Sequence, residues 1–213
     1  PALAYNAFTM LDRAAGKPIR VASKSVRSRG IMDAVLALPG YHGILAYTLP
    51  EALWLAETVE DVVVGYPSVD SEAFRILGTS AKLAKRVTIM VDSVDQLDAV
   101  DAAIPPTKRE SIRVAVELYS SWDAAVLGHT GVFRSPVHTP AEARTLAQLV
   151  VGRPGFTLVG MMGYEAQIAG LANMPASRLR GVAVRWIQRR SIAELADRRG
   201  KAVAAVREIA PLG

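Results

Sequence analysis

The chain has 213 residues, of which 51% are apolar, and it carries a formal net charge of +5. This length and apolar content are enough for one domain with a substantial core. Cysteine is absent, which excludes a disulfide framework, a thiolate catalyst and a cysteine-ligated metal site. The sequence shows neither a signal-peptide pattern nor an apolar run long enough to span a membrane, so we expect a cytoplasmic protein with no membrane partner.

The excess of basic over acidic residues, with a pI of about 9.7, raises the question of a nucleic-acid partner. The cations, however, are dispersed among 20 acidic residues. The densest basic run, Arg178–Arg199, includes Glu194 and Asp197. On a long helix such a run is typical of a solvated face, so we expect no nucleic acid to bind.

Six short segments rich in valine and isoleucine are apolar on both faces, as parallel strands covered on both sides are. They are Ile19–Ser23, Gly43–Tyr47, Asp61–Tyr66, Arg86–Asp92, Ser111–Leu118 and Phe156–Met162. Helical patterns lie between them at Ser25–Ala37, Pro50–Glu57, 71–84, 93–103 and 139–152, and a long amphipathic helix runs from about Arg178 to Ile209. The helix at 139–152 should begin with a capping box, because Thr139 is followed three residues later by Glu142.

Strands and helices that alternate at this spacing predict βαβ units and a parallel sheet. A doubly wound sheet usually carries a glycine-rich phosphate fingerprint after its first strand, and residues 23–30 do not match one. The sequence therefore favours a (β/α)8 TIM-type barrel, with about six βα units in a single domain over residues 1–213. The chain stops at Pro211–Gly213, where a seventh strand would begin, so we expect the barrel to be incomplete.

Chemistry in such barrels sits at the carboxyl ends of the strands, and the first strand is followed by a lysine. Strand alternation would place Arg20, Ala22 and Lys24 on the same face. Burial in the barrel mouth and the like charge of Arg20 would both favour the neutral amine of Lys24, the form that a nucleophile requires. The alternative is a lysine that extends from the strand end into solvent.

Several segments resemble one protein family in the same order along the chain. They are RVASKSVRS (20–28), GILAYTLPEALWLA (43–56), DVVVGYP (61–67), VTIMVDSVDQLD (87–98) and GMMGYEAQIAG (160–170). Together they resemble the alanine racemase N-terminal barrel family of pyridoxal-phosphate proteins, and within it the D-threonine aldolase and amino acid deaminase/aldolase branch. The resemblance covers about residues 17–173 and rests on the order of the motifs, since none of them is specific by itself.

The resemblance implies that Lys24 forms an internal aldimine with pyridoxal 5'-phosphate. It also implies that Arg134, in HTGVFRSP, lies near the ring oxygen of the cofactor, and that Tyr164, in GYEAQ, is a catalytic residue beside it. We further expect cofactor contacts from Arg20, Tyr47 and Asp92. Simpler interpretations stay open: a loop arginine at 134, strand-end packing at 164 and 47, and helix capping at 92.

The chemistry implied by this resemblance is that of a pyridoxal-phosphate enzyme acting on amino acids. We favour a lyase that performs aldol cleavage or deamination of a (D-)β-hydroxy amino acid. One alternative is an amino acid racemase, an isomerase, although no second base is recognisable. Others are a non-catalytic pyridoxal-phosphate carrier and a phosphate-binding barrel in which Lys24 pairs with an anion. The expected partner is a small amino acid, and related enzymes make a homodimer plausible.

The sequence departs from the family pattern after the fifth strand, where VAVELYSSWDAAVLGHTG (114–131) replaces the usual Asp-x-Gly turn. Gln167 stands where many aldolases have histidine. The loop that holds the cofactor phosphate is expected beyond Gly213, as is a C-terminal β-domain, to which any divalent metal would be confined. We predict no metal on this chain, because His42, His129 and His138 lack ligand spacing.

Overall fold

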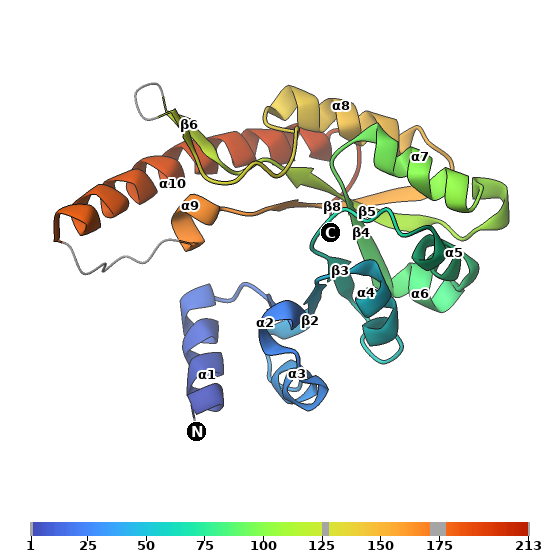
Figure 1. Ribbon diagram of the computed structural model, residues 1–213, viewed down its shortest axis with the longest axis horizontal. Coiled ribbons are helices and arrows are strands. Elements are labelled where there is room, and N and C mark those ends of the chain that lie inside the picture. Colours follow the sequence, from blue (N-terminus) through green and yellow to red (C-terminus); the bar gives the residue numbers. More distant parts are fainter. Residues whose placement is uncertain (1, 125–127, 171–177, 213) are drawn as a thin grey trace. The chain divides into compact units, whose positions relative to one another are not determined.

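Six strands of the computed structural model, which describes residues 2–124, 128–170 and 178–212, form one sheet in chain order (Figure 1). They are β1 (Ile19–Ala22), β2 (Tyr41–Ala46), β3 (Val62–Val64), β4 (Val87–Val91), β5 (Ile112–Leu118) and β8 (Phe156–Gly163). Strands β1 to β4 pair in parallel with their neighbours, for example Ile44 with Val62. Because helices alternate with these parallel strands, the predicted fold, a (β/α)8 barrel of which this chain holds six βα units, is confirmed.

Helices connect the strands and extend the chain at both ends of the sequence. They are α1 (Ala2–Ala14), α2 (Ser23–Val26), α3 (Arg29–Leu36), α4 (Leu49–Ala56), α5 (Ser71–Thr79), α6 (Ala81–Arg86), α7 (Val94–Ala103), α8 (Pro140–Val151), α9 (Ala166–Ala169) and α10 (Arg178–Arg207), with a 3-10 turn at Pro106–Lys108. Within the described ranges, no helix combines the length and the apolar character needed to cross a membrane.

The chain divides into two compact units. The first comprises Pro1–Met90 and Asp98–Arg113, and the second comprises Val91–Leu97 and Val114–Gly213. In the first unit, α3 packs against β1 and β2, and α4 packs against β3. Its core contains fully or almost fully buried apolar side chains, among them Ile44, Leu49, Leu55, Val62, Val64, Phe74 and Leu77.

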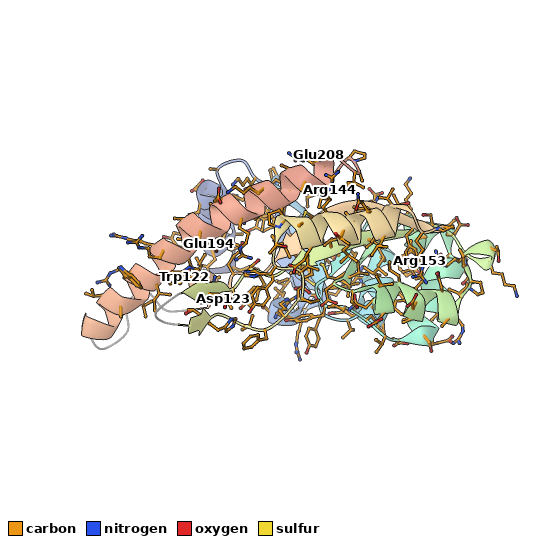
Figure 2. The ribbon with its side chains drawn as sticks, turned by 90° about the horizontal axis from the view of Figure 1, so that it is seen from above. Trp122, Asp123, Arg144, Arg153, Glu194 and Glu208 are labelled. Carbon is orange, nitrogen blue, oxygen red and sulfur yellow. The ribbon has the colours of Figure 1, made fainter. Side chains whose placement is uncertain are left out.

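In the second unit, α8 and α10 lie side by side, and α8 also packs against β8 (Figure 1). Figure 2 shows Arg144 on α8 beside Glu208, which follows α10, and these two side chains form an ion pair. The interior of this unit is built from buried residues of β5, α8 and α10, including Val114, Val116, Ala147, Val150, Ala202 and Val206.

The helices differ from the predicted ones at two serines. The helix expected at Ser25–Ala37 is divided between α2 and α3, because Arg27 adopts a left-handed backbone and Ser28 is extended. The helix expected at 71–84 is divided between α5 and α6 at Ser80, whose hydroxyl accepts a hydrogen bond from the Leu83 amide. Serine favours such a cap over a helix interior because its side chain satisfies a free backbone amide.

Other elements confirm or extend the prediction. The capping box of Thr139 and Glu142 is present at the start of α8. Helices α1 and α9 and a two-stranded antiparallel hairpin, β6 (Trp122–Ala124) and β7 (Gly128–Thr130), were not expected. The hairpin occupies the segment that departs from the family pattern, so the change in sequence corresponds to an added local structure. Gly213 lies outside the described residues.

Candidate functional site

The amine of Lys24 lies against two tyrosines that follow neighbouring strands. Its Nζ donates a hydrogen bond to the Tyr66 hydroxyl at 2.9 Å and lies 5.3 Å from the centroid of the Tyr66 ring. The Tyr47 ring packs edge-on against Tyr66, with 5.3 Å between centroids. Lys24 follows β1, Tyr47 follows β2 and Tyr66 follows β3, so the parallel order of these strands brings the three side chains to the same, carboxyl, edge.

The local backbone at Lys24 differs from the one expected. The strand ends at Ala22 and α2 begins at Ser23, so the expectation that Arg20, Ala22 and Lys24 share one strand face is wrong. Lys24 is exposed, so burial does not remove its amine from water as expected. Arg20 instead forms an ion pair with Asp61, 2.5 Å away, and Asp61 directly precedes β3 at the amino end of the strands.

A cavity of about 440 Å³ opens beside Lys24 within the first unit. It is lined by Lys24, Arg27, Arg29, Met32, Tyr47, Thr48, Glu51 and Trp54. Among the residues that the structure describes, none forms an ion pair with Lys24. A primary amine with a neutral hydrogen-bond acceptor and open space beside it is suited to condensation with a carbonyl group.

A second polar group, in the second unit, contains Arg134, Glu117, Tyr164 and Asp92. Arg134 Nε donates to Glu117 Oε1, and its guanidinium lies 5.6 Å from the centroid of the Tyr164 ring. Glu117 is fully buried on β5, and its Oε2 has no partner among the described residues. Burial raises the pKa of the Glu117 carboxyl, although the hydrogen bond and the charge of Arg134 act in the opposite direction.

Asp92, directly after β4, belongs to the same electrostatic group. Its Oδ1 accepts a hydrogen bond from Gln96 Nε2 at 2.9 Å, and its backbone amide donates to Gln96 Oε1 at 2.7 Å. Burial raises the pKa of Asp92, and the charge of Arg134 opposes this shift. The negative charge of Asp92 in turn contributes to the raised pKa of Glu117. Asp92, Arg134 and Tyr164 thus belong to one electrostatic group around Glu117, a carboxyl group that the motif comparison did not single out. Their expected contacts with a cofactor stay predictions.

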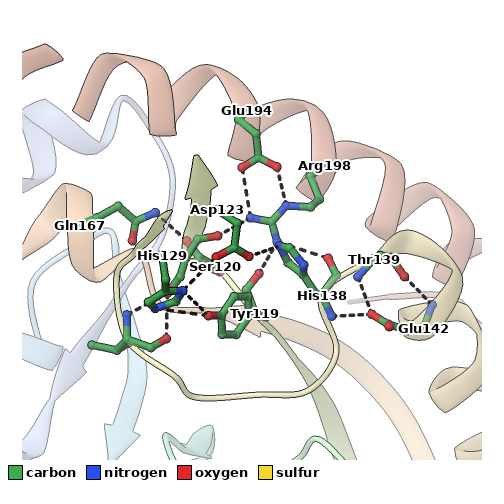
Figure 3. Close-up of polar contacts among 12 residues, drawn as sticks. Tyr119, Ser120, Asp123, His129, His138, Thr139, Glu142, Gln167, Glu194 and Arg198 are labelled. Atoms are coloured by element: carbon green, nitrogen blue, oxygen red, sulfur yellow. Dashed lines mark hydrogen bonds and ion pairs between the residues drawn. The ribbon is translucent and has the colours of Figure 1, made fainter. Parts of the chain in front are cut away.

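The chain after β5 is held by an arginine from α10 (Figure 3). Arg198 donates hydrogen bonds to the backbone carbonyls of Tyr119, Ser121 and His138, and it forms a two-point ion pair with Glu194. Arg198 is 9% exposed. The prediction that the basic run of this helix forms a solvated face is therefore wrong at Arg198, which anchors the loop instead.

The chain after β5 brings two histidines close to one acidic residue, Asp123 (Figure 3). His129 Nδ1 lies 2.9 Å from the Tyr119 hydroxyl and 3.0 Å from Asp123 Oδ1, and His138 Nε2 lies 3.8 Å from Asp123 Oδ2. No set of three potential ligands in the described part of the chain could hold a metal ion. Gln167, at the position of the aldolase histidine, is buried and donates to the Ser120 carbonyl at 2.7 Å.

The sequence assigned no specific role to three residues of these groups. Tyr66 was expected only to line the barrel mouth at the end of its strand, with plain packing as the alternative. Glu117 had a visible signal, because it is an acidic residue inside the apolar strand VAVEL. Arg27 was hidden in a basic stretch, and only the structure shows that it lines the cavity beside Lys24.

Comparisons with known proteins agree with the fold. The model of the family "Alanine racemase, N-terminal domain" matches residues 1–202. D-threonine aldolase from Filomicrobium marinum is similar in structure, with a TM-score of 0.66 and 19% identity, over 99% of this chain and 52% of that chain. D-threo-3-hydroxyaspartate dehydratase from Delftia sp. HT23 has a TM-score of 0.62 and 18% identity, over 99% and 50%.

Alanine racemase from E. faecalis has a TM-score of 0.60 and 14% identity, over 92% of this chain and 48% of that chain. No curated protein sequence matches. The chain thus spans about half the length of the solved structures that it resembles, and identities this low show a shared fold alone. The family model, in contrast, extends over nearly the whole sequence, including β1 with Lys24 and β5 with Glu117. The chain therefore belongs to the alanine racemase N-terminal domain family.

Proposed function

We propose that this chain is the cofactor-binding part of a pyridoxal-phosphate-dependent enzyme that acts on amino acids. The observation that carries the proposal is the position of Lys24, whose amine follows β1, contacts a phenol and opens onto a cavity. The residues present fit the cofactor, because an accessible primary amine that is not committed to a carboxylate can bind an aldehyde. Lys24 would hold the cofactor through this amine.

The cofactor would supply an electron-withdrawing ring that weakens the bonds at Cα of an amino acid. The side chains of the chain would then decide which bond breaks. Lys24 Nζ would carry a proton to or from the substrate, and the Tyr66 hydroxyl, 2.9 Å away, would orient the amine. Within the second unit, Glu117 would fix the guanidinium of Arg134, which lies against the Tyr164 ring. The contacts of Arg134 and Tyr164 with the cofactor stay predictions implied by the resemblance. Arg20, Tyr47 and Asp92 stay predictions as cofactor contacts.

For the reaction, we favour aldol cleavage or deamination of a β-hydroxy amino acid, with D-threonine as a substrate to test. The support is the resemblance of the RVASK and GYE motifs together with the structural likeness to a D-threonine aldolase and a D-threo-3-hydroxyaspartate dehydratase. Racemisation is a second candidate, supported by the likeness to an alanine racemase. A homodimer and a cytoplasmic location also stay predictions.

Product analysis on the full-length protein distinguishes these reactions. The protein, supplied with pyridoxal phosphate, is incubated with both enantiomers of threonine, serine and 3-hydroxyaspartate. Aldol cleavage yields glycine and an aldehyde, deamination yields ammonia and an oxo acid, and racemisation changes only the configuration at Cα. We expect one of the first two outcomes and its loss in Lys24→Ala.

Lys17→Ala is the matched control, because Lys17 is an exposed lysine of the same unit that does not line the cavity. It should retain the activity of the unmodified protein. Racemisation alone would replace the favoured reaction with the second candidate. Cofactor binding without conversion of any amino acid would indicate a carrier and would contradict the proposal that this protein is an enzyme.

A further inference from the structure

Arg27 has an unusual backbone conformation beside the cavity that Lys24 lines. Its φ is 48° and its ψ is 28°, in the left-handed region, and its amide donates to the Ser23 carbonyl at the end of α2. This region is disfavoured for residues that have a Cβ atom. Strained backbone of this kind is concentrated at ligand-binding sites, where it directs a side chain to a required position.

The guanidinium of Arg27 retains hydrogen-bond donors for a ligand. Its Nε donates to the Lys24 carbonyl at 3.1 Å, and its two terminal nitrogens have no partner among the described residues. Arg29, which lines the same cavity, differs: it forms an ion pair with Asp33, donates to the Thr58 hydroxyl and stacks on the Trp54 ring at 5.0 Å. Of these two arginines, Arg27 is therefore the one whose donors can meet a ligand.

The lining of the cavity has an excess of positive charge. Three cations, Lys24, Arg27 and Arg29, face one acid, Glu51. The Glu51 carboxylate is already used, because its Oε2 accepts a hydrogen bond from the Tyr47 amide at 2.8 Å. A guanidinium with free terminal nitrogens matches the two oxygens of a carboxylate. The cavity thus suits a ligand that carries an acidic group.

We infer that Arg27 binds an acidic group on the side chain of the amino acid substrate, so that the substrates are amino acids with a side-chain carboxylate. The inference rests on the proposed function, in which the substrate reaches Lys24. Lys24 and Arg27 line the same cavity, and Arg27 Nε donates a hydrogen bond to the Lys24 carbonyl at 3.1 Å. A substrate whose amino end is at Lys24 can therefore present a carboxylate a few bonds away to Arg27.

The experiment compares acidic and neutral amino acids on the full-length protein supplied with pyridoxal phosphate. Aspartate and 3-hydroxyaspartate are titrated alongside serine and threonine, in both configurations, while the absorption of the cofactor is followed. The unmodified protein should bind the acidic compounds more tightly by about 10- to 100-fold, as a charge-assisted hydrogen-bond pair provides. Arg27→Met should lose this preference, and Arg27→Lys should keep part of it.

The matched control is Arg75→Met on α5, an exposed arginine that pairs with Glu72 and does not line the cavity. It should retain the full preference for acidic compounds. A second titration compares pyridoxal phosphate with pyridoxal. If Arg27→Met weakens binding of the phosphorylated form only, Arg27 binds the cofactor phosphate and the inference is overturned.

Two other results would overturn it. The unmodified protein could show no preference for acidic compounds, or Arg27→Met could weaken acidic and neutral compounds equally. Borohydride reduction separates these failures from failure of the proposed function. Where pyridoxal phosphate is fixed to Lys24 but acidic compounds are not preferred, only the role of Arg27 is wrong. Where it is not fixed to Lys24, both proposals are wrong.

Discussion

At the scale of single residues, Glu117 is completely buried, and among the described residues only one of its two carboxyl oxygens, Oε1, has a hydrogen-bond partner. Burial raises its pKa above the ordinary value of 4.5, despite the adjacent Arg134. The folded protein therefore binds the proton of this group more tightly than the unfolded chain does. The resulting contribution to stability is complete below pH 4.5 and is lost as the pH rises through the pKa of the folded state.

We predict that Glu117→Gln makes stability less dependent on pH. Between pH 5 and pH 8 the unmodified protein should lose stability through this carboxyl, whereas the neutral amide has no proton to release. Urea unfolding at several pH values measures the effect as the shift of the midpoint.

The control for this prediction is Glu57→Gln. Glu57 is an exposed residue whose pKa is lowered by its hydrogen bond to Lys82, so it titrates below this pH range. Glu57→Gln should show the same change in the urea unfolding midpoint between pH 5 and pH 8 as the unmodified protein. If the unfolding midpoint changes with pH equally in the unmodified protein and in Glu117→Gln, Glu117 does not titrate in this range and the prediction is wrong.

The candidate site residues were taken from sequence motifs, and their roles stay predictions. Lys24, Arg134 and Tyr164 were identified from their motifs, and the structure gives each of them a polar or aromatic neighbour. The exposure of Lys24 agrees with the alternative that the sequence left open, a lysine that extends into solvent, and the burial expected from strand alternation fails because the strand ends at Ala22. Whether a side chain is buried depends on its tertiary surroundings, which a single sequence does not show. Glu117 was visible as an acid in an apolar strand, but its partner is 17 residues away.

At the scale of elements, Arg198 joins α10 to the loop that follows β5. The side chain is 9% exposed and donates to three backbone carbonyls, those of Tyr119, Ser121 and His138. A buried carbonyl that loses its hydrogen-bond donor is no longer compensated for its removal from water, and this lowers the free energy of unfolding. The arginine thus stabilises a segment that carries no regular secondary structure between β5 and β6.

We predict that Arg198→Met lowers the free energy of unfolding by about 3 kcal/mol, because three carbonyls lose their donor together. Arg199→Met, one position along α10, should change it by less than about 0.5 kcal/mol, since Arg199 is an exposed partner of Glu165. Chemical denaturation of the two variants measures the difference. Equal effects would contradict the anchoring role of Arg198.

Local patterns predicted most elements and missed those that depend on packing. The six strands of the sheet and the capped start of α8 follow from apolar runs and cap residues. The β6–β7 hairpin was missed, because its strands are three residues long and lack an alternating pattern. The solvated face predicted for the basic run failed at Arg198, since helix periodicity does not show which arginine meets a buried carbonyl.

At the scale of the whole molecule, strand order was the most predictable feature. Parallel strands with intervening helices follow from the spacing of apolar runs, and the strands of the sheet occur in chain order. The match of the family model to residues 1–202 agrees with this order. The strand order does not predict the reaction, because one fold supports many reactions and the residues of the site decide among them.

The central claim is that Lys24 is the residue that binds pyridoxal phosphate. The direct measurement is borohydride reduction of the full-length protein after incubation with the cofactor, followed by peptide mass mapping. We predict that the pyridoxyl mass appears on the peptide that contains Lys24, persists in Lys17→Ala and disappears in Lys24→Ala. A label that is spread over other lysines, or that is unchanged in Lys24→Ala, would contradict the account and favour an anion-binding role for Lys24.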